Sequence, residues 1–256
     1  MLSRLDQSNR EIQRLHAEQM SRAERLASIG EMAASVAHEI KNPLAGLSGA
    51  AQVLSKSFGS DDPRREAAQE MQKLTGRLDK TINDLLSFAR VIKPEWQWAN
   101  PNDIIEDALF FLRTDARDGQ CTLSENLDPD MPKIEVDPKQ LQQVLFNRVI
   151  NARQACGGGG VVEITSAARA SRPVMHEGDR DEYVEIRVSD NGPGIPPEIA
   201  AEIFKPFFTT KNQGTGLGLP ISRNVIEAHG GAMGVETEPG RGSVFYVWLR
   251  RERPKA

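Results

Sequence analysis

The stretch Ser-Val-Ala-His-Glu-Ile-Lys-Asn-Pro-Leu at residues 35–44 lies in an N-terminal segment whose pattern predicts a long helix. The first 57 residues contain one proline, Pro43, and three glycines. Their apolar residues fit a heptad repeat, which predicts a helix that pairs with a partner helix along one stripe. His38 falls at position f, opposite that stripe, and we therefore expect its imidazole to be exposed. The a positions are Leu5, Ile12, Leu26, Ala33 and Ile40, the d positions are Leu15, Ile29 and Val36, and Gln19 and Arg22 interrupt the repeat.

A second helix is expected after a short turn. Residues 56–63 contain a glycine, two aspartates and a proline, which together are typical of one helix ending and another beginning. From about residue 64 to residue 92, apolar residues again fall three or four apart. This pattern predicts an antiparallel hairpin. Because one hairpin buries only one face, we expect two copies to pack as a four-helix bundle in a homodimer.

The pattern changes beyond Lys93 and Pro94 from helical to mixed. A sheet covered on one side by helices, an α/β sandwich, is predicted by this alternation, and the polar stretch 170–182 is predicted to be an exposed loop. The fold class is therefore α+β, with the helical hairpin first and the sandwich second. Expected strands lie at 121–124, 161–165, 183–188 and 243–249, expected helices at 102–116, 138–155 and 219–229, and expected domains at 1–28 (coiled-coil signalling helix), 29–94 (hairpin) and 95–252 (sandwich).

Composition narrows the class of protein. The net charge of −4 over 256 residues does not favour a basic surface for nucleic acid. Cys121 and Cys156 lack metal-binding spacing, so we interpret them as free thiols in a reducing compartment. No stretch approaches the ~20 apolar residues of a membrane helix. We expect a cytoplasmic protein or the cytoplasmic portion of a longer, membrane-associated protein.

Two glycine-rich segments in the second domain have features that a nucleotide site needs. In Asp-Asn-Gly-Pro-Gly-Ile-Pro at 190–196, Asp190 ends a predicted strand and opens a turn. In Gly-Thr-Gly-Leu-Gly-Leu at 214–219, glycines precede a predicted helix, whose N-terminal N–H groups favour phosphate. On the preceding predicted helix, Asn147 and Asn151 are four residues apart and share a face, where their amide oxygens could reach a cation.

Each of these features is ambiguous alone, because glycine-rich turns and paired asparagines are common. Their occurrence in this order, downstream of an exposed histidine, is more specific. A nucleophile on one module and a phosphate site on another indicate a phosphoryl transferase that modifies itself.

The chain resembles the catalytic core of bacterial two-component sensor histidine kinases from about Arg25 to Leu249. Five motifs correspond in order, and the form of the first, with Phe-Phe-Thr-Thr-Lys before the last, is most similar to the nitrogen-regulator type. They are the H box at 38–43, the N box at 147–152, the first glycine box at 190–194, the F box at 204–208 and the second glycine box at 214–218.

This resemblance implies an ATP-binding domain related to gyrase and the heat-shock chaperones. Asp190 would accept a hydrogen bond from the adenine amine, Asn151 would bind Mg²⁺, and Asn147 would help to position the phosphates. Lys211, in a short lid between Phe208 and Gly214, would approach the γ-phosphate. The remaining residues implied in cofactor binding are Gly192, Gly194, Gly214, Thr215, Gly216, Leu217 and Gly218.

Two residues depart from the family pattern. Arg148 follows the first asparagine of the N box, where an aliphatic residue is usual, and Arg153 also stands where an apolar residue is common. Both could lie on an exposed face of the helix, or Arg148 could contact phosphate. The sequence leaves these alternatives open.

The histidine chemistry follows from ordinary acid–base behaviour. A histidine of ordinary pKa is largely neutral near pH 7, so His38 has a lone pair for attack on phosphorus. As the resemblance suggests, Glu39 could accept the other N–H and stabilise the imidazolium; the alternative is that Glu39 is only solvated. Asn42, one turn after His38, could orient water for dephosphorylation of a partner, as the resemblance suggests. Pro43 is expected to bend the helix close to His38.

The sequence therefore predicts a homodimeric, ATP- and Mg²⁺-dependent histidine kinase that phosphorylates His38 and passes the group to a response regulator. Phosphatase action on that regulator is a secondary expectation. Two alternatives remain: an ATPase of the same superfamily that drives a conformational clamp, and a dimeric scaffold that binds no nucleotide.

Overall fold

The computed structural model describes residues 37, 39–90, 92–114, 121–169, 182–211 and 214–253. The chain divides into two compact units, residues 1–91 and 92–256, and each is described here by itself. The expected N-terminal coiled coil, the exposure of His38 and nearly all of the 170–182 loop lie outside the described residues. The domain boundaries predicted from the sequence remain predictions.

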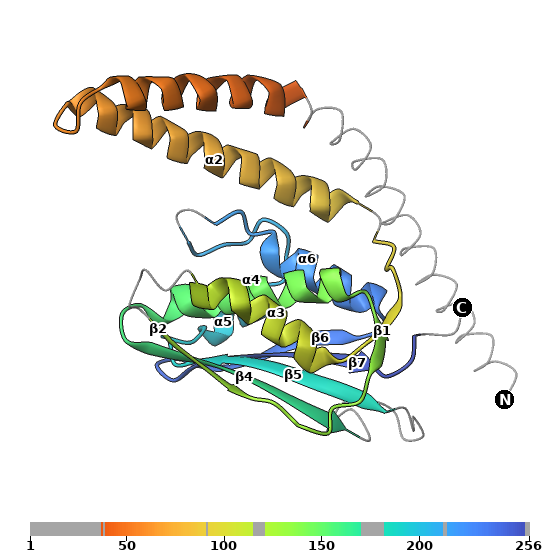
Figure 1. Ribbon diagram of the computed structural model, residues 1–256. Coiled ribbons are helices and arrows are strands. Elements are labelled where there is room, and N and C mark those ends of the chain that lie inside the picture. Colours follow the sequence, from red (N-terminus) through yellow and green to blue (C-terminus); the bar gives the residue numbers. More distant parts are fainter. Residues whose placement is uncertain are drawn as a thin grey trace, which may run out of the picture. The chain divides into compact units, whose positions relative to one another are not determined.

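The first unit is the predicted antiparallel hairpin (Figure 1). Helical residues 39–57 are followed by a turn and then by α2 (Pro63–Ala89). The carboxylate of Asp62 caps α2 by accepting the backbone N–H of Arg64 at 2.9 Å. Across the hairpin, Lys41 Nζ donates to Asn83 Oδ1 at 2.6 Å.

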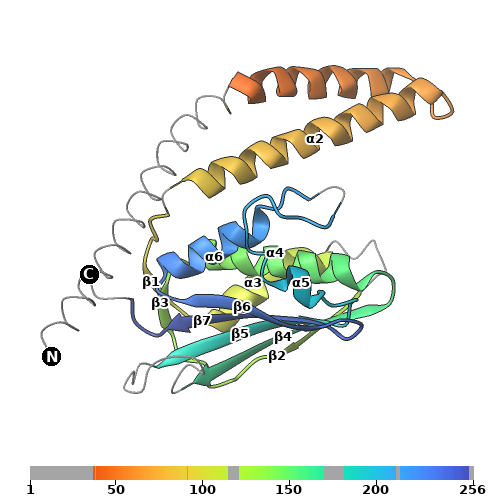
Figure 2. The same cartoon turned by 180° about the vertical axis from the view of Figure 1, so that it is seen from behind.

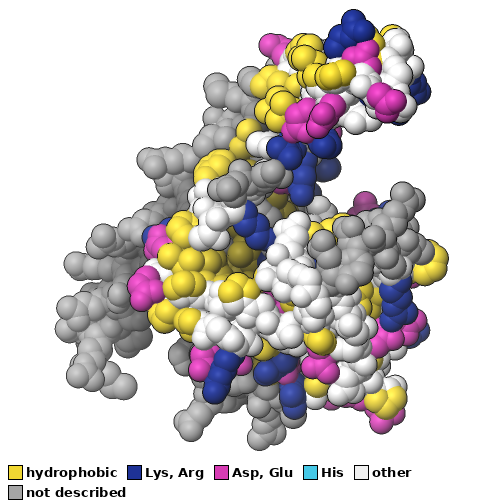
Figure 3. Space-filling model, turned by 90° about the vertical axis from the view of Figure 1, so that its left-hand side faces the viewer, with side chains coloured by type: hydrophobic (Ala, Val, Ile, Leu, Met, Phe, Trp, Pro, Cys, Tyr) yellow, Lys and Arg dark blue, Asp and Glu magenta, His cyan; other side chains and the backbone are white. Residues whose placement is uncertain are grey.

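The interior of this hairpin is thin. Its buried side chains are mostly small and run along one line of each helix: Ala37, Leu44, Ala51, Ala68, Thr75 and Ala89. Larger apolar side chains remain exposed on both helices, and Figure 3 shows hydrophobic surface on this part of the molecule. These exposed residues are Ile40, Leu47, Val53, Leu54, Met71, Leu74 and Leu78. A single hairpin therefore leaves part of the apolar pattern of both helices exposed. Exposed apolar stripes on paired helices are typical of an interface.

The second unit contains a five-stranded sheet of order β2-β4-β5-β7-β6. The β2–β4 pair is parallel and the other three pairs are antiparallel. The strands are β2 (Cys121–Asn126), β4 (Gly160–Arg169), β5 (Tyr183–Asp190), β6 (Ala232–Glu238) and β7 (Gly242–Arg250).

Helices α3 (Pro101–Thr114), α4 (Pro138–Cys156) and α6 (Gly218–Ala228) cover one face of this sheet, as Figures 1 and 2 both show. Strand β4 alternates accordingly: Val162 and Ile164 are buried under the helices, whereas Val161 and Glu163 are exposed on the other face. The predicted sandwich is therefore confirmed, and the core lies between the sheet and the three helices.

Four short or edge elements were not predicted. Strands β1 (Gln97–Ala99) and β3 (Ile134–Val136) form a separate two-stranded ribbon, and α5 (Pro197–Ala200) is a single turn. Strand β6 lies at the edge of the main sheet, where Met233 is its one buried residue. Such elements carry little apolar periodicity, which explains why the sequence pattern did not indicate them.

Candidate functional site

Helix α4, which carries the two asparagines, is fixed at its N-terminus by Asp137. Oδ1 of this carboxylate accepts the backbone N–H groups of Lys139 and Gln140, each at 3.1 Å, and caps the helix. Its Oδ2 accepts the N–H of Glu95 at 2.9 Å. Pro138 occupies the first helical position, where a missing N–H costs nothing. The start of α4 is therefore rigidly placed.

Asn147 and Asn151 lie one turn apart on α4 and are both partly exposed. The adjacent faces of the helix pack into the core through Val144, Leu145, Val149 and Ala152. The two amides thus stand where the core meets solvent. The predicted pairing of the asparagines on one face is consistent with this arrangement.

Asp190 is the last residue of β5 and is 8% exposed. Its Oδ1 accepts the N–H of Gly192 at 3.0 Å. Burial raises the pKa of this carboxyl group, while hydrogen bonds from the backbone of Gly192 and Ser243 and the charge of Lys211 act in the opposite direction. These two backbone donors hold the carboxylate in one orientation.

Gly192 is required by its surroundings. A Cβ at this position would stand 2.8 Å from Asp190 Oδ1 and 3.0 Å from the backbone of Ala155 in α4. Any side chain would therefore push the turn away from α4 or displace the carboxylate. This glycine allows the β5 turn to pack directly on the helix that carries the asparagines.

The second glycine-rich segment is fastened to residues 204–208. Gly216 adopts φ +67°, and a Cβ there would overlap the backbone of Phe207. The Phe207 N–H donates to the Gly216 carbonyl at 3.1 Å. Leu217, which is buried, then leads into α6, and among the described residues, which exclude 212 and 213, no side chain caps that helix at its start. The N–H groups of the first turn of α6 are therefore available to an acceptor.

Lys211 lies in the predicted lid and is exposed. Its Nζ donates to Gln154 Oε1 on α4 at 2.7 Å. Its charge also acts on Asp190, where it offsets part of the rise in pKa that burial causes. Residues 212 and 213 lie outside the described part of the chain. This lysine links the lid to the helix beside the asparagines.

Three contacts bring the predicted segments together around the C-terminal half of α4. The first glycine turn meets the helix at Ala155, and the lid lysine meets it at Gln154. At the start of α6, a Cβ on Gly218 would lie 3.9 Å from a side-chain nitrogen of α4. Elements far apart in sequence therefore border the same stretch of helix as the asparagines.

Gln154 is a residue of this site that the sequence did not single out. It follows Asn151 by three positions and so continues the same face of α4. That spacing was the available signal, but glutamine on a helix is usually a solvated residue. Only its contact with the lid distinguishes it.

The sequence left two alternatives open for Arg148, an exposed face of the helix or contact with phosphate, and the structure contradicts the first. Arg148 is 2% exposed, so the interpretation that it lies on an exposed face is wrong. Its guanidinium carbon lies 5.5 Å from the centroid of the Phe245 ring, and burial lowers its pKa to about 9. Arg153 is partly exposed, and its Nη1 donates to the Leu112 carbonyl at 3.5 Å.

The other predicted catalytic residues belong to the first unit. Glu39 and Asn42 are exposed on the first helix, and the helix continues through Pro43. His38 itself lies outside the described residues. The expected bend at Pro43 remains a prediction.

The side chains of the site suit Mg²⁺ bound together with phosphate better than a metal ion bound by protein ligands alone. Across the described ranges, no cluster of three or more histidine, cysteine or carboxylate side chains could hold a metal ion. Mg²⁺ commonly takes one or two protein oxygens and completes its shell with phosphate and water. The partly exposed Asn151 amide fits that mode of binding.

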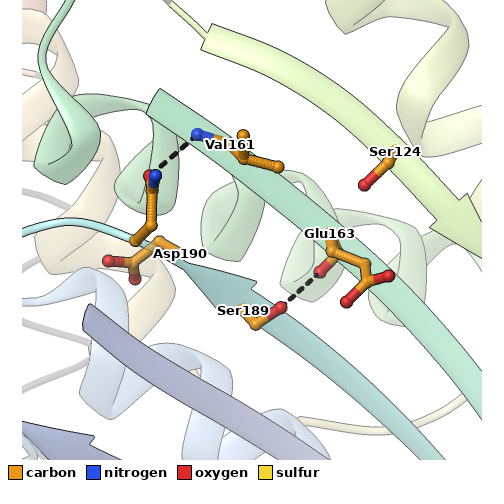
Figure 4. A pocket seen from close by; sticks show the side chains of 6 residues that line it. Ser124, Val161, Glu163, Ser189 and Asp190 are labelled. Carbon is orange, nitrogen blue, oxygen red and sulfur yellow. Dashed lines mark hydrogen bonds between the residues drawn. The ribbon is translucent and has the colours of Figure 1, made fainter. Parts of the chain in front are cut away.

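A hollow of about 270 Å³ opens where β4 begins and β5 ends (Figure 4). It is lined by Ser124, Val161, Glu163, Ser189, Asp190 and Asn191. Asn191 Oδ1 accepts the Val161 N–H at 2.8 Å, and Ser189 Oγ donates to the Glu163 carbonyl at 3.3 Å. Val161 and Glu163 lie on the face that the helices do not cover, whereas Asp190 belongs both to this hollow and to the site beside α4.

Comparison with protein families gives two matches. Residues 28–93 match the His Kinase A (phospho-acceptor) domain. Residues 136–253 match the histidine kinase-, DNA gyrase B- and HSP90-like ATPase domain, which includes α4, both glycine-rich segments and the lid. Within the described residues, no helix is long and apolar enough to cross a membrane.

Among curated relatives, the chain is 37% identical over 240 residues to the sensor histidine kinase ZraS of Salmonella typhimurium, covering 93% of this chain and 50% of that protein. It is also 37% identical over 250 residues to the sensory histidine kinase/phosphatase NtrB of Rhodobacter capsulatus, covering 94% and 68%. The chain thus spans about half the length of the first of these relatives.

Two solved structures extend the likeness to three dimensions. Full-length ShkA in complex with AMPPNP aligns with a TM-score of 0.71 at 26% identity, over 89% of this chain and 47% of that one. The histidine kinase ThkA in complex with the response regulator TrrA aligns with a TM-score of 0.64 at 30% identity, over 92% and 66%.

Proposed function

This chain belongs to the sensor histidine kinases, and we propose that it transfers the γ-phosphoryl group of Mg²⁺-ATP to its own His38 and then to an aspartate of a response regulator. The observation that carries this proposal is the convergence of the Asp190 turn, the Lys211 lid and the start of α6 on one half of α4. The ShkA relative was crystallised with an ATP analogue and ThkA with a response regulator, which supports both halves of the proposal.

In this proposal, the base of ATP lies against Asp190. The N–H of Gly192 donates to Oδ1 of this carboxylate, and Oδ2 would accept from the exocyclic amine of adenine. Gly194 belongs to the same turn. The carboxylate would therefore select adenine by accepting a hydrogen bond that guanine, with a carbonyl at that position, could not donate.

The phosphates would lie between α4 and the second glycine box. Asn147 and Asn151 present amides from α4, and Asn151 would bind Mg²⁺, which neutralises charge on the phosphates when it is bound. Lys211 would leave Gln154 for the γ-phosphate as the lid closes. Backbone N–H groups at the start of α6 would donate to the phosphates. The segment that leads into this helix contains the remaining predicted binding residues, Gly214, Thr215, Gly216, Leu217 and Gly218.

The phosphoryl acceptor in this proposal is His38. A neutral imidazole nitrogen attacks the γ-phosphorus, a P–N bond forms, the bond from phosphorus to the β,γ-bridging oxygen breaks, and ADP departs. Glu39 accepts a hydrogen bond from the other ring nitrogen and stabilises the imidazolium. In the second step, an aspartate oxygen of the regulator displaces the histidine from phosphorus.

A homodimer is the assembly that we propose for the hairpin. Its exposed Leu47, Val53, Met71, Leu74 and Leu78 would be covered by a second copy in a four-helix bundle. Residues 1–28 would serve as a coiled-coil signalling helix, 29–94 as the phosphotransfer hairpin, and 95–252 as the ATP-binding domain. Use of ATP and two reduced cysteines are consistent with reaction in the cytoplasm.

Labelling with γ-³²P-ATP tests this function. We expect the intact chain to acquire label that is lost in acid and retained in base, because phosphohistidine hydrolyses in acid. Formation of ADP without label would instead indicate the conformational-clamp ATPase. Absence of nucleotide binding by titration would indicate the non-catalytic scaffold.

Asn42 tests the second proposed activity, dephosphorylation of the regulator. The exposed amide of Asn42 stands one turn after the phosphoryl acceptor and would orient water. We expect Asn42→Ala to keep autophosphorylation within about twofold and to slow dephosphorylation of a phosphorylated receiver domain by about 100-fold. Gln52→Ala, another exposed amide on the same helix, is the matched control. Equal loss of both activities in Asn42→Ala would assign this residue a structural role instead.

A further inference from the structure

Arg148 is a buried cation that has no hydrogen-bond partner among the described residues. It is 2% exposed, and its Nε, Nη1 and Nη2 make no hydrogen bond within the part of the chain that the structure describes. Its guanidinium lies beside the Phe245 ring, with 5.5 Å from the guanidinium carbon to the ring centroid. Burial alone lowers the pKa of this group to about 9. A buried arginine is normally paired, because an unpaired charge in the interior is strongly unfavourable.

The guanidinium points toward the start of α6. Nη2 lies 3.9 Å from the position that a Cβ on Gly218 would occupy. Gly218 is the first residue of α6, and Leu217 before it provides no side-chain cap. The absence of a side chain at Gly218 therefore leaves the guanidinium close to the uncapped N-terminal turn of α6.

Two positively charged groups thus lie together. The N-terminus of an eleven-residue helix carries a partial positive charge and free N–H donors. A guanidinium beside it adds a full charge and up to five donors. This arrangement is unfavourable by itself and becomes favourable when an anion accepts from both groups.

We propose that Arg148 and the first turn of α6 together bind a phosphate group of the nucleotide. This inference rests on the proposed function and adds a ligand to it. The phosphate oxygens would accept from Nη2 on one side and from the α6 backbone N–H groups on the other. Arg148 would thus be a binding residue from within the core, whereas Lys211 reaches the nucleotide from the exposed lid.

Replacement of Arg148 by leucine tests the proposal. Leucine removes the charge, keeps apolar contact with Phe245, and is expected to leave the fold intact or more stable, because a buried unpaired charge is removed. Unfolding of the free protein by heat verifies this. We expect the affinity of Arg148→Leu for ATP and for ADP to fall at least about 10-fold, because a charge-assisted hydrogen bond is lost. The affinity for adenosine, measured by displacement of a fluorescent nucleotide, is expected to stay within about twofold.

Inorganic pyrophosphate serves as a probe without a base. We expect it to displace ATP from the intact chain and to do so much more weakly from Arg148→Leu. Arg148→Lys keeps a charge but not the forked geometry, so its ATP affinity is expected to lie between those of the parent and of the leucine variant.

Two results would overturn the proposal. Unchanged ATP affinity in Arg148→Leu would show that this residue contacts no phosphate, and an equal loss for adenosine and ATP would place it under the base instead. Failure of the proposed function has a different signature. If the intact chain bound pyrophosphate through Arg148 but bound no adenosine nucleotide, the phosphate site would stand and the kinase assignment would fall.

Discussion

Replacement of Asp190 by asparagine is expected to reduce ATP affinity by about 100-fold or more. The reason lies in how the carboxylate is already used. Its Oδ1 accepts the Gly192 N–H at 3.0 Å. If the asparagine oxygen keeps that hydrogen bond, the amide nitrogen must face the adenine amine, and two donors then oppose each other. If the amide turns round, the Gly192 N–H loses its acceptor in a buried turn.

Calorimetric titration with ATP and with adenosine measures this effect. We expect Asp190→Asn to lose affinity for both ligands, because the lost contact is to the base. The control is Asp130→Asn, which removes the same charge from an exposed turn. ATP affinity in Asp190→Asn close to that of the control would show that the base binds elsewhere.

The set of ligands whose affinity falls in each variant separates the roles of Asp190 and Arg148. Loss of the Asp190 contact affects every ligand that contains adenine, whereas loss of Arg148 is expected to affect every ligand that contains phosphate. Each variant therefore serves as a reference for the other. A site in which both variants behaved alike would not have separate base and phosphate regions.

Much of the second unit could be predicted because its main elements bury one face. Helices α3, α4 and α6 and strands β4, β5 and β7 have an apolar spacing set by the core between sheet and helices. Strand β6 was not predicted, because it lies at the edge of the sheet and Met233 is its one buried residue. Strands β1 and β3 are three residues each and depend on pairing with one another. No local pattern can carry that information.

The site shows a similar division. The sequence predicted that Asp190 lies at the end of a strand and that the two asparagines share one face of a helix, because both placements follow from local periodicity. It also suggested that the glycines serve the approach of phosphate. In the structure, Gly192 and Gly216 are required by the chain itself, because side chains there would meet Ala155 and Phe207. The shape of the site therefore depends on packing between segments distant in sequence.

Arg148 is the residue about which the sequence was least decisive. Helical geometry places Arg148 about 100° from Asn147 around the axis of α4. It does not say whether another element covers that face of the helix. Phe245 from β7 and the start of α6 cover it in the structure. Because arginine is usually exposed, only tertiary contacts could reveal a buried one.

The second large effect concerns the phosphoryl acceptor. We expect His38→Gln to lose the acid-labile label by at least about 100-fold, because the nucleophile itself is removed. Its ATP affinity is expected to be unchanged, since the nucleotide contacts proposed above belong to the other unit. Glutamine keeps a polar side chain of similar length and a good helix propensity, so loss of the helix is not a competing explanation.

The chain has four histidines, and two of the other three supply the controls. His229 is 3% exposed, its Nε2 accepts the Asp137 N–H at 3.1 Å, and its Nδ1 lies 2.7 Å from the Val225 carbonyl oxygen. Both ring nitrogens are thus occupied, so this residue cannot accept a phosphoryl group without unfolding around it. His16→Gln and His176→Gln are therefore the matched variants, and both are expected to label like the parent. Label that survived in His38→Gln and disappeared in either control would move the acceptor to that histidine and refute the assignment of His38.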